Sequence, residues 1–153
     1  MTEREFVVKS LPAVRLAERS AVATSQPEVG PLIGPMFDQV AEALFAAARQ
    51  PGLAVAYYVS TEDSFECHAG FEYTGAVADG FEIGELPAEA QAVSLLHHGA
   101  LAGISDSWMA VFGWFTDSAF EPAGPCREIY LESPMGDQDS WVTELQQPFA
   151  RRS

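Results

Sequence analysis

The sequence has few basic residues and many acidic ones. Its 153 residues include 8 Lys and Arg against 22 Asp and Glu, a formal net charge of −14. Proteins that bind DNA or RNA directly present a basic face to the phosphates, so this balance argues against direct nucleic-acid binding. The charge is compatible with a cationic ligand, with a basic protein partner, or with solubility alone.

Cysteine is scarce, and long apolar runs are missing. Cys67 and Cys126 form no CxxC pair, so we expect a reduced, cytoplasmic protein. No stretch approaches the roughly eighteen apolar residues of a membrane span. The first residues also lack the basic start and apolar core of a signal peptide, and we therefore expect no membrane association.

Motifs for metals and nucleotide cofactors are missing as well. The histidines and cysteines match no zinc-ligand spacing, and the neighbouring His97 and His98 point to opposite faces of a predicted strand. There is no phosphate-binding loop, dinucleotide fingerprint or Ser-His-Asp arrangement. We expect neither a metal nor a cofactor.

Apolar residues, by contrast, are abundant enough to build a core. They make up 48% of the chain, which is typical of a globular protein rather than a disordered one. A length of 153 residues suits one domain. We therefore expect residues 1–153 to form a single domain.

Hydrophobic periodicity in the first half predicts strands around one helix. A Pro- and Gly-containing stretch at 24–35 is expected to be a loop or an irregular helix entry. The helix is predicted over 35–50, with apolar residues at three- and four-residue spacing. The strands are predicted over 5–10, 14–22, 53–59 and 65–74.

The second half repeats the first. Residues 81–88 echo residues 6–13 at an offset of 75 (81 − 6), and residues 124–130 align with residues 52–58 at an offset of 72 (124 − 52). Repeat one spans about 4–78 and repeat two about 79–149. The predicted fold class is α+β: a tandem β-β-α-β-β repeat with pseudo-twofold symmetry, antiparallel sheets and two main helices around a central cleft.

Glu128 is the principal candidate for a functional residue. It lies in a predicted strand, on the face shared with Tyr130 and opposite Arg127. A carboxylate in such an apolar segment is costly unless a protein cation or a ligand cation pairs with it. The alternatives are a salt bridge, with Arg127 or Arg15, and a solvent-exposed edge position. A second acid, Glu144, is expected to be exposed.

The repeat indicates what would surround Glu128. It aligns Glu128 with a small apolar residue and places aromatic and thioether side chains at equivalent positions of the two halves. A shared cleft with such walls and a single acid is typical of a small-molecule pocket. The tyrosines and the helix residues also fit core packing, which stays the alternative for them. The predicted ligand contacts are Glu128, Tyr130, Tyr58, Ala56, Met36, Phe37, Trp108 and Phe112.

Several motifs occur in the order and spacing of a known family. They are His97-His98-Gly99, Trp114, the segment from Arg127 to Leu131, and the segment from Thr143 to Pro148. With the tandem repeat they cover essentially the whole chain, which resembles the GyrI-like small-molecule-binding domain. That domain occurs alone and as the effector-binding half of multidrug-responsive AraC- and MerR-type regulators. One departure is Ala100-Leu101, where the family pattern usually has an aromatic residue.

The resemblance implies binding of bulky, apolar, often cationic compounds between the two repeats. The acid at the position of Glu128 is the usual electrostatic anchor, with aromatic residues around it. Some stand-alone members are similar to hydrolases that open strained cyclopropane rings of DNA-alkylating compounds with that glutamate, and others antagonise DNA gyrase. The chain is therefore expected to be a sensor or sink for such compounds, a detoxifying hydrolase, or an acidic module for a protein partner. Because the two repeats occupy all 153 residues, a DNA-binding appendage is not expected.

Overall fold

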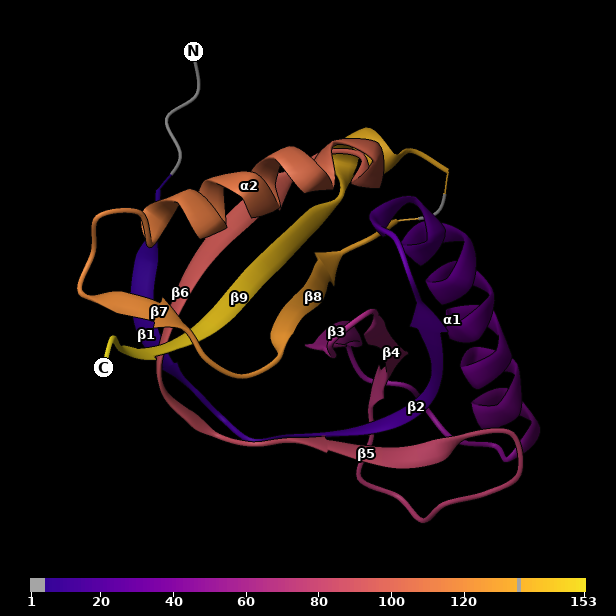
Figure 1. Cartoon of the computed structure of the whole chain (residues 1–153). Coiled ribbons are helices and arrows are strands. Elements are labelled where there is room, and N and C mark those ends of the chain that lie inside the picture. Colours follow the sequence, from indigo (N-terminus) through magenta and orange to yellow (C-terminus); the bar gives the residue numbers. More distant parts are fainter. Residues whose placement is uncertain (1–4, 135) are drawn as a thin grey trace. The chain divides into compact units, whose positions relative to one another are not determined.

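The computed structural model describes residues 5–134 and 136–153 (Figure 1). Both repeats have the predicted order of elements, with one additional short strand, β7, in the second. The α+β class and the antiparallel pairing are confirmed. The elements are β1 (Val7–Leu11), β2 (Val14–Ala23), α1 (Val29–Ala46), β3 (Ala54–Ser60), β4 (Phe65–Glu72), β5 (Glu82–Leu86), β6 (Glu89–His98), α2 (Ile104–Trp114), β7 (Phe120–Pro122), β8 (Cys126–Glu132) and β9 (Val142–Arg151).

The chain divides into two compact units that differ from the sequence repeats by an exchange of strands. One unit contains the chain up to Pro12 together with Ala88–Ser153, and the other is Ala13–Pro87. We call them the α2 unit and the α1 unit. The first strand of each repeat pairs with the second strand of the other, β1 with β6 and β5 with β2. The repeated Leu-Pro-Ala sequence, at 11–13 and again at 86–88, stands at both boundaries between the units.

In the α2 unit, the strands run in the order β1-β6-β9-β8, and β7 pairs with the far end of β9. Helix α2 lies against β6 and β9 (Figure 1). Its buried residues follow helical spacing, so one stripe of the helix meets the sheet. The resulting core consists of Val93, Leu95, Trp108, Val111, Phe115, Leu145 and Phe149.

The α1 unit has the same plan, with the strand order β5-β2-β4-β3. Helix α1 packs against β2 and β4 (Figure 1). Val40 and Leu44 from the helix join Ala17 from β2 in its core. On α1 the residues Met36, Val40 and Leu44, four positions apart, are buried, as the helical spacing of apolar residues predicts.

Helix α1 begins earlier than the sequence indicates. Of the two alternatives for residues 24–35, a loop or an irregular helix entry, the loop is wrong from Val29 onward. The helix starts at Val29 and contains Pro31 and Pro35. Pro31 lies in the first turn, where backbone N–H groups have no intrahelical acceptor, so proline costs little there. The helix ends at Ala46, and Ala48 follows with a positive φ of 56° while the Arg49 N–H donates to the Leu44 carbonyl at 2.8 Å.

Neither helix is both long enough and apolar enough to cross a bilayer, within the residues that the structure describes.

Candidate functional site

Strand β8 directs Glu128 toward helix α2. Glu128 is paired across the sheet with Leu145, which belongs to the core beneath α2, and Tyr130 is paired with Thr143 on the same face. Arg127 has the opposite orientation, as the alternation of side chains predicts. The strand therefore places Glu128 and Tyr130 together in the α2 unit.

The Glu128 side chain is buried (4% exposed) and accepts hydrogen bonds from two aromatic residues. The indole Nε1 of Trp108 donates to Oε2 at 2.7 Å, and the Tyr130 hydroxyl donates to Oε1 at 2.6 Å. Hydrogen bonds to an ionised acceptor are shorter and stronger than neutral ones. The two donors come from different elements, α2 and β8, so the carboxylate also ties the helix to the sheet.

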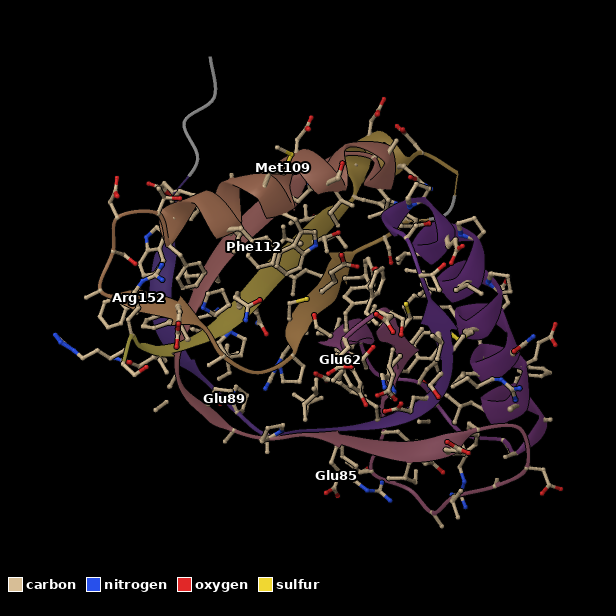
Figure 2. All side chains as sticks on the ribbon, viewed as in Figure 1. Glu62, Glu85, Glu89, Met109, Phe112 and Arg152 are labelled. Atoms are coloured by element: carbon tan, nitrogen blue, oxygen red, sulfur yellow. The ribbon has the colours of Figure 1, made fainter. Side chains whose placement is uncertain are left out.

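An aromatic stack leads from this carboxylate to the surface of the α2 unit. The Trp108 and Phe112 rings stack with their centroids 5.8 Å apart, and Phe112 is 45% exposed. Figure 2 shows Phe112 and Met109 on different sides of α2. Trp108 thus contacts the buried acid with its N–H and an exposed ring with its face.

A second polar contact secures the N-terminal end of α2 to β6. His97 is buried, and its ring nitrogens lie 2.8 Å from Ser107 Oγ and 2.9 Å from the Ala100 carbonyl oxygen. Ser107 directly precedes Trp108 in the helix. This contact positions the turn of α2 that carries the indole.

The remaining predicted site residues belong to the α1 unit. Ala56 is fully buried on β3, and Tyr58, two residues further on the same face, is half-buried. Met36 is buried on α1, and the Phe37 ring packs edge-on against Phe71 at 5.8 Å. The structure therefore brings together Glu128, Tyr130, Trp108 and Phe112 in the α2 unit, while Ala56, Tyr58, Met36 and Phe37 lie in the α1 unit.

The α1 unit contains a buried acid that the sequence analysis missed. Glu18 on β2 is 4% exposed and accepts a hydrogen bond from the Tyr57 hydroxyl at 2.6 Å. His68 Nδ1 also contacts the Glu18 carboxylate, and the His68 ring stacks on Tyr57 with centroids 4.3 Å apart. Burial, and then the bond to Glu18, raises the pKa of the Tyr57 phenol above its usual value. The sequence feature that could have indicated the burial of Glu18 is its spacing from Leu16. The two residues are two positions apart on β2, so they share one face of the strand, and Leu16 is an apolar residue that is buried.

The prediction that Glu144 is exposed is wrong. Its side chain is 13% exposed, and it forms an ion pair with Lys9 Nζ at 2.6 Å and accepts a hydrogen bond from Gln146 at 2.8 Å. Lys9 comes from β1, which reaches this sheet through the strand exchange. The partner therefore lies far away in sequence.

Arg127 is fully buried, on the face of β8 opposite Glu128. Its guanidinium lies 3.7 Å from Glu89, and burial lowers its pKa more than that carboxylate raises it. Arg127 is therefore paired away from Glu128 inside the α2 unit.

Two surface hollows of the α1 unit lie elsewhere. One, of about 400 Å³, is lined by residues 13–15 and 85–87, and the other, of about 440 Å³, by residues 49–52 and 72–75. Neither includes a predicted site residue. Among the described residues, no three His, Cys, Asp or Glu side chains are grouped so that they could hold a metal ion.

Comparison with known proteins is consistent with the sequence motifs. The model of the family described as "GyrI-like small molecule binding domain" matches residues 4–150. Curated proteins give no sequence match.

Among solved structures, the C-terminal domain of EcmrR is similar, with a TM-score of 0.74 and 18% identity over 99% of this chain and 100% of that one. SAV2435 bound to tetraphenylphosphonium has a TM-score of 0.68 at 11% identity, covering 95% of this chain and 94% of that one. A hydrolase from Listeria innocua has a TM-score of 0.65 at 11% identity, covering 98% and 94%. At these identities the similarity shows the fold alone.

Proposed function

The chain belongs to the GyrI-like small-molecule-binding domain family, and we propose that it binds apolar, cationic or polyaromatic molecules whose positive charge is recognised by Glu128. Such a protein serves as a sensor or as a sink for drugs and toxins. The observation that carries the proposal is a carboxylate, 4% exposed, that accepts hydrogen bonds from two aromatic side chains, Trp108 and Tyr130. The similar fold of SAV2435, which binds tetraphenylphosphonium, agrees with this ligand class.

Aromatic neighbours suit a large organic cation better than a small inorganic one. A cation whose charge is spread over several rings loses less hydration on burial than an ammonium group does. The faces of Trp108 and Phe112 add cation–π attraction of about 0.5–2 kcal/mol. Both carboxylate oxygens accept hydrogen bonds, so a ligand approaches across these ring faces or displaces one of the donors.

The test compares tetraphenylphosphonium with tetraphenylborate, two ions of nearly the same shape and opposite charge. We expect calorimetry to detect binding of the cation and much weaker binding of the anion. Glu128→Gln should weaken binding of the cation by roughly 30-fold, about 2 kcal/mol, because it removes a buried charge but keeps the shape of the side chain.

Glu132→Gln provides the matched control. Glu132 lies on the same strand and is exposed, and its replacement by Gln changes the net charge by the same amount as Glu128→Gln. It should change the affinity for the cation less than twofold, because exposed charges are screened by solvent and salt. Equal losses in the two variants would show that the overall acidity of the protein, and not Glu128, attracts the cation.

A second candidate function is hydrolysis of strained-ring alkylating compounds at the same acid. The observation that favours it is the 2.6 Å hydrogen bond between Glu128 and the Tyr130 hydroxyl, because a carboxylate and a phenol in contact form an acid–base pair. Incubation of a cyclopropane-bearing alkylator with substoichiometric protein distinguishes the two functions. Ring-opened product in excess over protein, lost in Glu128→Gln, would indicate a hydrolase, whereas binding without turnover would indicate sequestration.

A further inference from the structure

Thr143 carries a buried hydroxyl that forms no hydrogen bond with the described part of the chain. Its side chain is fully buried, and among the described residues Oγ1 has no hydrogen-bond partner. Such groups are rare because each one lowers the stability of the fold. Valine has nearly the same shape and favours strands equally, so folding alone would be served better by valine at this position.

This hydroxyl lies in the same region of the α2 unit as Glu128. Thr143 is on β9, where it is paired with Tyr130 of β8 on one side and with His97 of β6 on the other. The Cβ atoms of directly paired residues lie about 4.5–5.5 Å apart. Thr143 also shares a face with Leu145, which packs in the core beneath α2. It therefore faces the helix, as Glu128 does.

The polar groups beside Thr143 already have partners. The Tyr130 hydroxyl donates to Glu128, and both ring nitrogens of His97 lie within hydrogen-bond distance of Ser107 and the Ala100 carbonyl oxygen. Among the described side chains of this network, Thr143 is the one whose polar atom has no hydrogen bond. An unsatisfied hydroxyl lowers the stability of the ligand-free protein, and its presence is explained if a bound ligand forms a hydrogen bond with it.

We propose that Thr143 is a specificity-determining residue of the ligand site and that its hydroxyl hydrogen-bonds a polar atom of the bound cation. The inference rests on the proposed function at Glu128 and narrows the ligand class. Glu128 recognises the positive charge, while Thr143 favours aromatic cations that also carry a hydroxyl, carbonyl or N–H group over cations made of hydrocarbon alone.

The experiment uses tetraphenylphosphonium and its 3- and 4-hydroxyphenyl analogues, which differ from it by one hydroxyl. Because the four arms of the cation are equivalent, the substituted ring can occupy whichever arm position lies closest to Thr143. We expect the wild-type protein to prefer the better hydroxylated analogue by about 5–10-fold, as for one additional hydrogen bond. Thr143→Val should reduce this ratio to about 1, and Thr143→Ser should retain it.

Thermal unfolding separates a binding role from a structural one. Removal of an unsatisfied buried hydroxyl should leave Tm of the ligand-free Thr143→Val protein unchanged or higher. A decrease of more than about 2 °C would show that the hydroxyl stabilises the fold, and the inference would be wrong. An affinity ratio near 1 in the wild type, or equal weakening of all three cations in Thr143→Val, would also overturn it.

Failure of the underlying proposal has a different signature. If none of the three phosphonium ions binds the wild-type protein, or if Glu128→Gln leaves their affinities unchanged, the cation site at Glu128 itself is wrong and the inference about Thr143 falls with it. If the ions bind and Glu128→Gln weakens their binding, but Thr143→Val leaves the affinity ratio between the hydroxylated and unsubstituted ions unchanged, only the inference about Thr143 is wrong.

Discussion

Glu128 in the α2 unit and Glu18 in the α1 unit are the buried acidic residues of the described chain, and they lie on opposite faces of equivalent sheets. Glu128 faces its helix, where Trp108 donates to it. Glu18 follows Ala17, which packs against α1, so Glu18 points away from that helix. The repeat equivalent of Glu128 is Ala56. The shared fold therefore does not require an acid at that position.

The same holds for Glu18. Glu18 pairs with Glu82 on β5. The repeat equivalent of Glu82 is Val7, at an offset of 75 (82 − 7), and Val7 pairs with Ser94 on β6. Ser94 is therefore the counterpart of Glu18 in the α2 unit. Each unit thus carries an acid where the other has a small residue. The two halves have kept one architecture while they differ at the buried polar positions.

The donors to the two acids differ in chemistry. Glu18 contacts His68, which is able to carry a positive charge, as well as the Tyr57 hydroxyl. The donors to Glu128 named above, an indole and a phenol, stay neutral as donors. We interpret Glu18 as an acid that mainly stabilises its own unit and Glu128 as one that serves binding.

The largest expected effect contrasts the stability of two Glu→Gln variants. Glu18→Gln should lower the free energy of unfolding by about 3 kcal/mol, because it removes one partner of a buried charge-assisted pair with His68. Glu128→Gln should cost only about 1 kcal/mol, because the new amide oxygen still accepts a hydrogen bond from one of two neutral donors. Urea unfolding with an unchanged m-value measures both. Equal losses would remove the distinction between a structural and a binding acid.

A somewhat smaller effect is expected at Gly84, which makes room for Glu18. A Cβ built on Gly84 would lie 1.4 Å from Glu18 Oε1, so Gly84→Ala forces the carboxylate to move. We expect a loss of about 2 kcal/mol in the free energy of unfolding, within the range for overpacking. In the α2 unit the repeat equivalent is Lys9 (84 − 75), whose long side chain reaches Glu144. The two units therefore use this position in opposite ways.

Gly113→Ala is the control for Gly84→Ala. Gly113 lies within α2, is exposed and does not precede a proline, and a Cβ there would meet no atom within 4 Å beyond its neighbours in the chain. This substitution should stabilise the protein by about 0.5–1 kcal/mol, because alanine favours a helix over glycine. If Gly84→Ala proved equally harmless, Glu18 would have other positions available, and its fixed contacts with Tyr57 and His68 would be in doubt.

Local patterns were sufficient to predict most of the elements and the face of β8 that Glu128 shares with Tyr130. The alternation in β8 and the helical spacing in α2 each depend on residues close in sequence. Partner choice between strands is non-local, and so the exchange of β1 and β5 between the units was not predicted. The repeated Leu-Pro-Ala sequence marks the two positions where the chain passes from one unit to the other. It does not indicate with which strand the neighbouring segment pairs.

The burial of Glu18 and the low exposure of Glu144 escaped prediction for a related reason. Glu18 is followed by Arg19 and Ser20, so the sequence around it looks like an exposed strand end. Its partners lie on β3 and β4, and the partner of Glu144 lies on β1. A charged side chain is buried when its partners are brought to it, and those partners are set by the topology of the sheet.

The smallest effect concerns the pH dependence of the α1 unit. Burial and the bond to Glu18 raise the pKa of Tyr57 in the folded protein, while an unfolded tyrosine titrates near pH 10. The stability contributed by the neutral phenol is therefore complete below about pH 10 and is lost as the pH rises toward the folded pKa. Wild-type stability should fall above pH 10 more steeply than that of Tyr57→Phe, by up to about 1.4 kcal/mol per pH unit. All other titrating groups are common to both proteins, so the difference in slope in urea unfolding reports Tyr57. Parallel curves would mean that the phenol is not held against the Glu18 carboxylate, and the hydrogen bond between Tyr57 and Glu18 would be wrong.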